Sequence, residues 1–347
     1  MSQILVVGMS GPTINYPEVV ASSCRAAGCS VEVASQPFCY LSEIRPKHVR
    51  AWRQAIANAG EGIFTVFVAG QAEYFLGSAD LSLHFSGYTR WFDSSRMRVI
   101  PHPWSSAERP DETAIEWADK PSLHVGFMGS TYEGSRAGQI VNRAPGAVRD
   151  WVLTGHHLRS ADLYAAALTA RLPLTYAGTF VRSRTMAAMR KTPLAKGGEF
   201  RCEARNGFGG TAAEIAAYAE HLVWSTYVLC PRGIENYSFR LYEALRFGRV
   251  PVIIDTDMVL PPDVDWPKVA LIVPFGELDR LPEIISADWK VRSASAFRER
   301  QALARAAAAS LDSGQWLERV ASEIARRAVS KGAVARRFGE QLAPALG

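Results

Sequence analysis

The sequence lacks the cysteine pattern of a disulfide-bonded or zinc-binding protein. Five cysteines occur, an odd number without a CxxC pair, and they are Cys24, Cys29, Cys39, Cys202 and Cys230. This pattern argues against a disulfide framework and against a cysteine zinc site, and it is typical of proteins from a reducing compartment.

The sequence also has no recognisable segment that would direct it into or across a membrane. Its N-terminus, MSQILVVGMSG, enters a strand-like apolar run with no basic region ahead of it, so we do not expect a signal peptide. No apolar stretch approaches the roughly 18 to 20 residues that cross a bilayer. We therefore expect a cytoplasmic protein.

Charge of one sign is in small excess, and it is not concentrated anywhere. The 347 residues carry a formal net charge of +5, with lysines and arginines scattered among acidic residues. No DNA- or RNA-binding motif occurs, so we predict no nucleic-acid partner. A mild positive balance suits a protein that handles an anionic small substrate or works near an anionic membrane surface.

Short apolar runs alternate with helical patterns along the first hundred residues. The predicted strands are 4–7, 31–34, 63–68, 81–85 and 97–100, and the predicted helices are 17–27 and 46–59. Such alternation of strand and helix predicts a parallel sheet with helices on its faces.

A proline-rich stretch with little periodicity separates this half from a second one. Beyond it we predict strands at 123–130, 151–154, 226–230 and 250–255, helices at 161–170, 212–225 and 238–247, and a helical C-terminus. The chain is therefore predicted to be an α/β protein with two Rossmann-like, doubly wound domains. The predicted boundaries are 1–105 for the first domain, 106–121 for a linker, 122–310 for the second domain and 311–347 for a helical tail.

One stretch, TYVLCPRGIENYSFRLYEALRFGRVPVIID, combines the features of an anion site. It predicts a strand, a turn, a helix with Ser238 as its N-cap and Gly248 at its end, and a second strand. The helix N-terminus offers free amides and positive dipole, and the flanking guanidinium groups of Arg232 and Arg240 suit phosphate. Glu243 lies on the same helix face as Arg240, where it would accept hydrogen bonds from a ribose or form a solvated ion pair.

The motifs CPRG, SFRLYEAL, GRVPVII and LPPDVDW resemble those of the exostosin-type glycosyltransferases, glycosyltransferase family 47. The resemblance is close over 214–266 and looser over 123–136, and in the first hundred residues it rests on layout alone. It implies the GT-B architecture, in which a donor domain over 122–310 faces an acceptor-side domain over 1–105 across a cleft.

The resemblance also implies donor-binding roles for residues that match the family's motifs. They are Arg232, Gly233, Ser238, Arg240 and Glu243, together with Gly129, Ser130 and Arg136 near the first strand of the donor domain. In the first group the two arginines would hold the diphosphate, and the glycine would let the backbone approach the diphosphate. The serine would help to bind it at the start of the helix, and the glutamate would bind the ribose. The second group would form the opposite wall.

Members of this family invert the anomeric centre, which requires a base for the acceptor hydroxyl and stabilisation of the leaving diphosphate. Arginines and a helix dipole can supply the second without a metal, so no cofactor is expected. We interpret the DTD of Asp255 to Asp257 as a loop near the donor. The base is unassigned, and the candidate histidines are His84, His102, His156 and His157.

The resulting hypothesis is an inverting hexosyl- or pentosyltransferase that uses a UDP-sugar. Its acceptor would be a glycan or lipid-linked saccharide in bacterial surface polysaccharide assembly. Two alternatives stay open: a fucosyltransferase-like enzyme that uses a GDP-sugar, and a non-catalytic protein that binds nucleotide sugars. The basic tail from Gln315 onward either associates with the inner, anionic face of a membrane or packs on the first domain.

Overall fold

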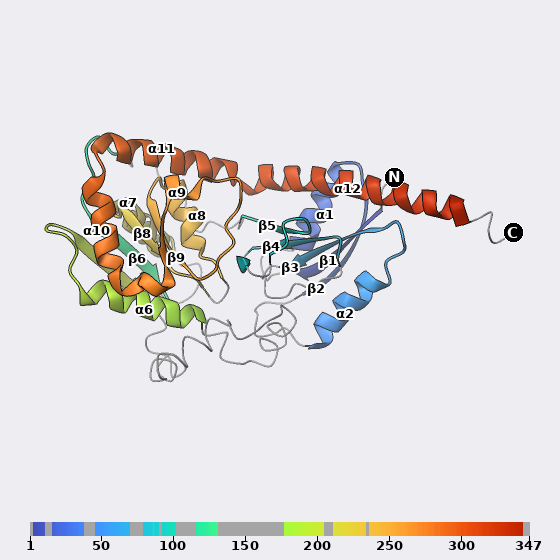
Figure 1. Cartoon of the computed structure of the whole chain (residues 1–347), viewed down its shortest axis with the longest axis horizontal. Coiled ribbons are helices and arrows are strands. Elements are labelled where there is room, and N and C mark those ends of the chain that lie inside the picture. Colours follow the sequence, from blue (N-terminus) through green and yellow to red (C-terminus); the bar gives the residue numbers. More distant parts are fainter. Residues whose placement is uncertain are drawn as a thin grey trace.

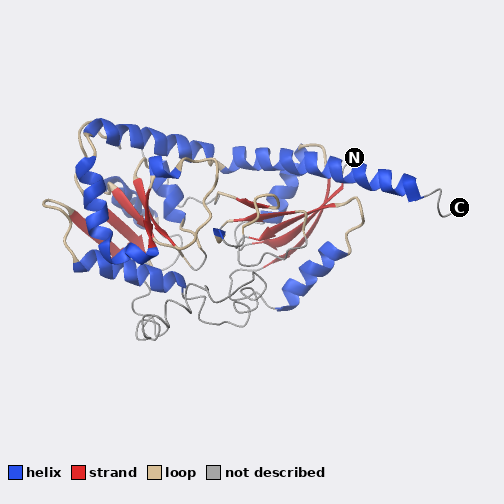
Figure 2. Ribbon diagram, in the orientation of Figure 1, coloured by secondary structure: helices blue, strands red, loops and turns tan. Residues whose placement is uncertain are grey.

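The chain folds into two α/β domains, each built on a five-stranded sheet, with a long C-terminal helix that runs from one domain to the other (Figure 1). Figure 2 shows the two sheets as separate sets of strands with helices beside them. This computed structural model describes residues 3–10, 16–37, 46–69, 79–85, 87–89, 92–101, 116–130, 177–204, 211–233 and 236–342.

The N-terminal sheet has the strand order β2-β1-β3-β4-β5, and all its described strand pairs are parallel. Its elements are β1 (Gln3–Ser10), α1 (Tyr16–Ala26), β2 (Ser30–Pro37), α2 (Pro46–Ala57), β3 (Phe64–Ala69), β4 (Leu81–His84) and β5 (Met97–Val99). A parallel sheet is covered on both faces, so its strands are short apolar runs with buried side chains such as Val6, Val66 and Leu83.

The C-terminal sheet has the order β10-β9-β8-β6-β7, again with parallel pairs among the described strands. Its elements are β6 (His124–Gly129), α6 (Ala177–Lys191), β7 (Glu199–Ala204), α7 (Ala212–Trp224), β8 (Tyr227–Cys230), α8 (Phe239–Arg246), β9 (Val250–Asp255), α9 (Trp266–Val269), β10 (Leu271–Pro274), α10 (Leu281–Val291) and α11 (Ala294–Ser310). Two doubly wound parallel sheets confirm the predicted GT-B fold class.

Several elements of the C-terminal domain are not predicted by the sequence, namely α6, β7, α9, β10 and the start of α10. Strand β7 lies at the edge of the sheet, and none of its side chains is fully buried, so EFRCEA contains no apolar run that would indicate a strand. The predicted strand 151–154 and the predicted helix 161–170 lie outside the described residues.

The helical tail forms α12 (Ser313–Leu342), which crosses from the C-terminal domain and packs on α1 and β3 of the N-terminal one (Figure 1). Lys331 pairs with Asp80 at 2.8 Å, and Glu323 pairs with Arg98 at 2.6 Å. Of the two alternatives for the tail, this geometry supports packing on the N-terminal domain. Within the described ranges, no helix combines the length and apolarity that a membrane span requires.

Candidate active site

The candidate site lies where the strand order of the C-terminal sheet reverses. The chain begins this sheet with β6, adds β7 on one side of it and then adds β8 on the other side. Ligands of open α/β sheets bind at the carboxyl ends of strands at such a reversal, because the loops of the two strands diverge there. Gly129 ends β6 and is followed by Ser130, while the CPRG turn begins at the last residue of β8. Both segments that the sequence nominated therefore meet at the reversal point.

Arg240 crosses from the first turn of α8 to the end of β6. Its Nε donates to the carbonyl oxygen of Met128 at 2.6 Å, and its guanidinium lies over the ring of Phe127, 4.5 Å from the centroid. A Cβ atom at Gly129 would stand 1.6 Å from Nη2 of Arg240. Only glycine therefore lets the arginine reach this position, and the structure brings Gly129 and Arg240 together.

Arg232 points from the CPRG turn toward the other domain. Its side chain is 2% exposed, and its Nη1 donates to the hydroxyl of Tyr88 at 2.6 Å. Since Tyr88 belongs to the N-terminal domain, the guanidinium lies at the junction of the two domains. The adjacent Gly233 does not offer its amide to a ligand, because that amide donates to the carbonyl of Tyr237 at 2.8 Å.

A third arginine, which the motifs did not indicate, joins the two loops. Arg182 on α6 donates from Nε to the carbonyl of Arg232 at 3.1 Å and from Nη1 to the carbonyl of Ser130 at 3.0 Å. One guanidinium thus spans the loop after β6 and the turn after β8. The sequence FVRSR holds no spacing that would single out this arginine, since its role depends on two loops about 50 residues away on either side.

Ser238 occupies the N-cap position of α8, as predicted, but its hydroxyl does not make the capping hydrogen bond that is typical of an N-cap serine. The amide of Leu241 donates to the backbone carbonyl of Ser238 at 3.2 Å, and the hydroxyl makes no cap bond. The side chain is 3% exposed, and its Oγ has no hydrogen-bond partner among the described residues. A buried hydroxyl without a partner is costly, so a ligand oxygen at the α8 N-terminus would supply the missing bond.

Glu243 is buried rather than solvated. Its side chain is 5% exposed, and its Oε2 accepts a hydrogen bond from the hydroxyl of Tyr218 on α7. Burial and the neighbouring carboxylate hold the pKa of Tyr218 well above its usual range, so this phenol stays a donor. The solvated Arg–Glu pair that the sequence left open does not describe this carboxylate, which is fixed in the interior.

The DTD stretch forms a turn that contacts the N-terminal domain. Oδ1 of Asp255 accepts from the amides of Asp257 and Met258 at 2.9 and 3.2 Å, and the hydroxyl of Thr89 donates to the carboxylate of Asp257. Among the described residues, no three histidine, cysteine or acidic side chains are arranged to hold a metal ion. Asp255 stabilises the turn, and Asp257 forms a contact between the domains.

The base remains unassigned. His84 lies in β4 with no exposed surface, so it does not open on the junction between the domains. His102, His156 and His157 fall outside the described residues, as does Arg136.

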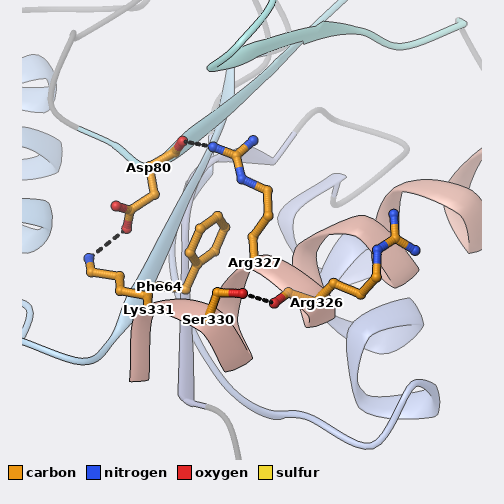
Figure 3. Close-up of a pocket in the computed structure, with 6 residues that line it drawn as sticks. All are labelled: Phe64, Asp80, Arg326, Arg327, Ser330 and Lys331. Carbon is orange, nitrogen blue, oxygen red and sulfur yellow. Dashed lines mark hydrogen bonds and ion pairs between the residues drawn. The ribbon is translucent and has the colours of Figure 1, made fainter. Parts of the chain in front are cut away.

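A separate pocket of about 380 Å³ lies at the other end of the N-terminal strands, against α12. Figure 3 shows Asp80 between Lys331 and Arg327, with the ring of Phe64 beside them. Arg327 donates to the backbone carbonyl of Asp80 at 3.0 Å. Phe64 opens β3 and Asp80 precedes β4, so this pocket is at the amino ends of the strands, away from the candidate site.

One segment of the chain is similar to known glycosyltransferase sequences. Residues 169–287 match the model of the exostosin GT47 domain. An exostosin-1 homolog of Caenorhabditis elegans is 40% identical over 77 residues, which cover 22% of this chain and 20% of that protein. A probable glucuronosyltransferase of Oryza sativa subsp. japonica is 38% identical over 74 residues, which cover 21% of this chain and 17% of that protein. The chain thus matches about a fifth of the length of these curated relatives.

Solved structures share the layout only distantly. A sucrose-phosphate synthase from Thermosynechococcus elongatus has a TM-score of 0.41 at 11% identity and covers 98% of this chain and 100% of its own. The apo form of the lipopolysaccharide outer core galactosyltransferase WaaB has a TM-score of 0.44 at 11% identity, with 94% and 99% covered. Likenesses at these TM-scores do not bear on function. The matched segment contains the site motifs, so this part of the chain is similar to the exostosin GT47 domain.

Proposed function

We propose that the chain is a glycosyltransferase that takes a sugar from a nucleoside diphosphate donor bound at the reversal point of the C-terminal sheet. The observation that carries this proposal is that Arg232, in the turn after β8, and Arg240, in the first turn of α8, flank the N-terminus of this helix, with Arg240 reaching the end of β6. Such a combination of guanidinium groups and helix dipole is suited to a diphosphate. Ser238 adds a buried hydroxyl at the same helix end, without a partner among the described residues.

The proposed chemistry uses these groups to stabilise the leaving diphosphate. As the bond between the sugar and the diphosphate breaks, negative charge grows on the phosphate oxygens, and fixed positive groups stabilise that charge more than they stabilise the ground state. Glu243, held by Tyr218, would accept hydrogen bonds from the ribose hydroxyls. A saccharide acceptor would approach from the N-terminal domain, with inversion at the anomeric carbon. The nucleotide is UDP in this proposal, and the reaction is expected to proceed without a metal.

A panel of UDP, GDP, CMP and ADP in thermal unfolding tests the proposal. A ligand at 100 times its dissociation constant stabilises the folded state by about 2.7 kcal/mol, which gives a readily measured rise in melting temperature. We expect UDP to stabilise the chain. Stabilisation by GDP alone would favour the fucosyltransferase-like alternative, and no effect from any of the four nucleotides would contradict the proposal. Hydrolysis or transfer from the matching sugar nucleotide then separates an enzyme from a binding protein.

Replacement of Arg182 by alanine should weaken UDP binding by up to about thirtyfold, because two hydrogen bonds that join the loops are each worth about 1 kcal/mol. Arg184 provides the matched control: it lies two residues further along α6 and pairs with the exposed Asp279 at 3.4 Å. Titration calorimetry of Arg182→Ala and Arg184→Ala measures both. An equal loss of affinity in the two variants would indicate general damage to the helix and would contradict the joining role.

A further inference from the structure

A short segment of the N-terminal domain is anchored in the C-terminal domain beside the CPRG turn. Tyr88 forms an isolated antiparallel bridge with Met258. On either side of it, the carbonyl of Gly87 accepts from the amide of Val259 at 3.1 Å, and the amide of Thr89 donates to the carbonyl of Asp257 at 3.1 Å. The backbone of Tyr88 is therefore fixed relative to the donor domain, although Tyr88 follows β4 of the N-terminal sheet in the chain.

The anchoring is completed by a side chain of the donor domain itself. Nδ2 of Asn236, which is fully buried, donates to the carbonyl of Gly87 at 3.1 Å and to the carbonyl of Thr256 at 3.2 Å. Asn236 lies between the CPRG turn and α8 in the chain. The same loop that leads to the candidate diphosphate site thus holds the segment that carries Tyr88.

The side chain of Tyr88 meets the guanidinium of Arg232. Tyr88 is 3% exposed, its hydroxyl accepts from Nη1 at 2.6 Å, and the guanidinium carbon lies 5.6 Å from the centroid of its ring. A phenol hydroxyl is neutral, so its hydrogen bond orients the guanidinium without bringing a negative charge to it. A carboxylate in the same place would instead neutralise the charge that a diphosphate needs.

We propose that Tyr88 is a positioning residue of the donor site, which holds Arg232 in the orientation that binds the diphosphate. This inference rests on the function proposed above. It makes the N-terminal domain a contributor to donor affinity, because the orienting hydroxyl comes from that domain while the charge comes from the other. Donor binding and the contact between the domains are coupled through this one hydrogen bond.

The test compares UDP with uridine on the full chain carrying Tyr88→Phe, which keeps the ring and removes only the hydroxyl. We expect the dissociation constant of UDP to rise about tenfold, equivalent to about 1.4 kcal/mol, while that of uridine stays within twofold. Should GDP be the nucleotide that binds, GDP and guanosine replace the pair. Because uridine lacks the phosphates, an equal loss for both ligands would show a merely structural effect and would overturn the proposal.

Thr89→Val is the matched control, because it removes the hydroxyl that bonds Asp257 at the same junction and does not touch Arg232. We expect it to leave UDP affinity within twofold. A double-mutant cycle completes the test: in the Arg232→Ala background, Tyr88→Phe should cause no further loss. Unchanged UDP affinity in Tyr88→Phe, or a full additional loss in the Arg232→Ala background, would overturn the positioning role alone. A wild-type chain that binds neither UDP nor GDP would overturn both the function and this inference.

Discussion

Arg240→Ala is expected to abolish the thermal stabilisation of the chain by UDP and to weaken UDP binding by about a hundredfold or more. A hydrogen bond between charged partners is worth about 1.5 to 3 kcal/mol, and a guanidinium makes several such bonds to a diphosphate. The variant also loses the hydrogen bond from Nε to the carbonyl of Met128, which places the arginine at the end of β6. Titration calorimetry at fixed salt measures the affinity, and circular dichroism checks that the domain remains folded.

The matched control for this variant is Arg246→Ala, in the last turn of the same helix. It removes a positive charge of the same kind at the opposite end of α8, where no diphosphate is expected. UDP affinity should stay within about twofold of the wild type, since Arg246 lies about 9 Å along the helix axis from Arg240 and salt weakens the interaction of charges over such a distance. An unchanged affinity in Arg240→Ala, or the same loss in both variants, would remove the diphosphate assignment.

Asp288→Ala is expected to lower the free energy of unfolding by about 3 to 5 kcal/mol, because it leaves a buried guanidinium without its counter-ion. Arg300, 3% exposed, donates from Nη1 to Asp288 at 2.9 Å. The same carboxylate accepts from the hydroxyl of Tyr227 at 2.7 Å and from Nη2 of Arg292 at 2.8 Å. This network joins β8 to α10 and α11. Urea unfolding at neutral pH measures the loss.

The contribution of Asp288 should also depend on pH. Burial raises the pKa of this carboxyl, but the hydrogen bond from Arg292 and the charge of Arg300 outweigh burial, and the pKa is lowered. A group whose folded-state pKa is lowered contributes stability above its unfolded pKa, about 3.9 for aspartate, and that contribution disappears as pH falls through the folded pKa. The difference in stability between the wild type and Asp288→Ala should therefore shrink below about pH 4.

Asp279→Ala is the control for the stability measurement. Asp279 is an exposed acid that pairs with Arg184 at 3.4 Å. An exposed ion pair contributes about 0 to 1 kcal/mol, so this variant should change the free energy of unfolding by no more than that. A loss below about 1 kcal/mol in Asp288→Ala would contradict the view that this carboxylate holds the buried guanidinium.

Much of the fold follows from local pattern. Each predicted strand and helix in the described part of the first hundred residues is present, since parallel strands buried on both faces produce apolar runs that glycine and loop residues interrupt. Strand β7 is missed for the opposite reason: at the sheet edge its side chains remain at least partly exposed, and they carry no apolar pattern. Helix α6 differs from β7, because its side chains Phe180 and Met186 are buried in the core. Its arginine at the candidate site, Arg182, has no motif around it.

The residues of the candidate site also differ in how far the sequence predicts them. Arg232, Ser238, Arg240 and Glu243 lie within one contiguous strand, turn and helix, so their spacing alone places them near one helix N-terminus. Even there the hydroxyl of Ser238 makes no cap bond, and the amide of Leu241 donates to the backbone carbonyl of Ser238 instead.

The sequence by itself determined the two doubly wound domains and the arginine-bearing turn, because these depend on residues that are close together along the chain. Only the tertiary structure decided which distant side chains complete the site: Tyr88 from the other domain, Arg182 from α6 and Tyr218 from α7. Each acts through one or two hydrogen bonds to residues 25 to 144 positions away. No local periodicity encodes such a contact, since it exists only once both sheets and the helices between them have packed.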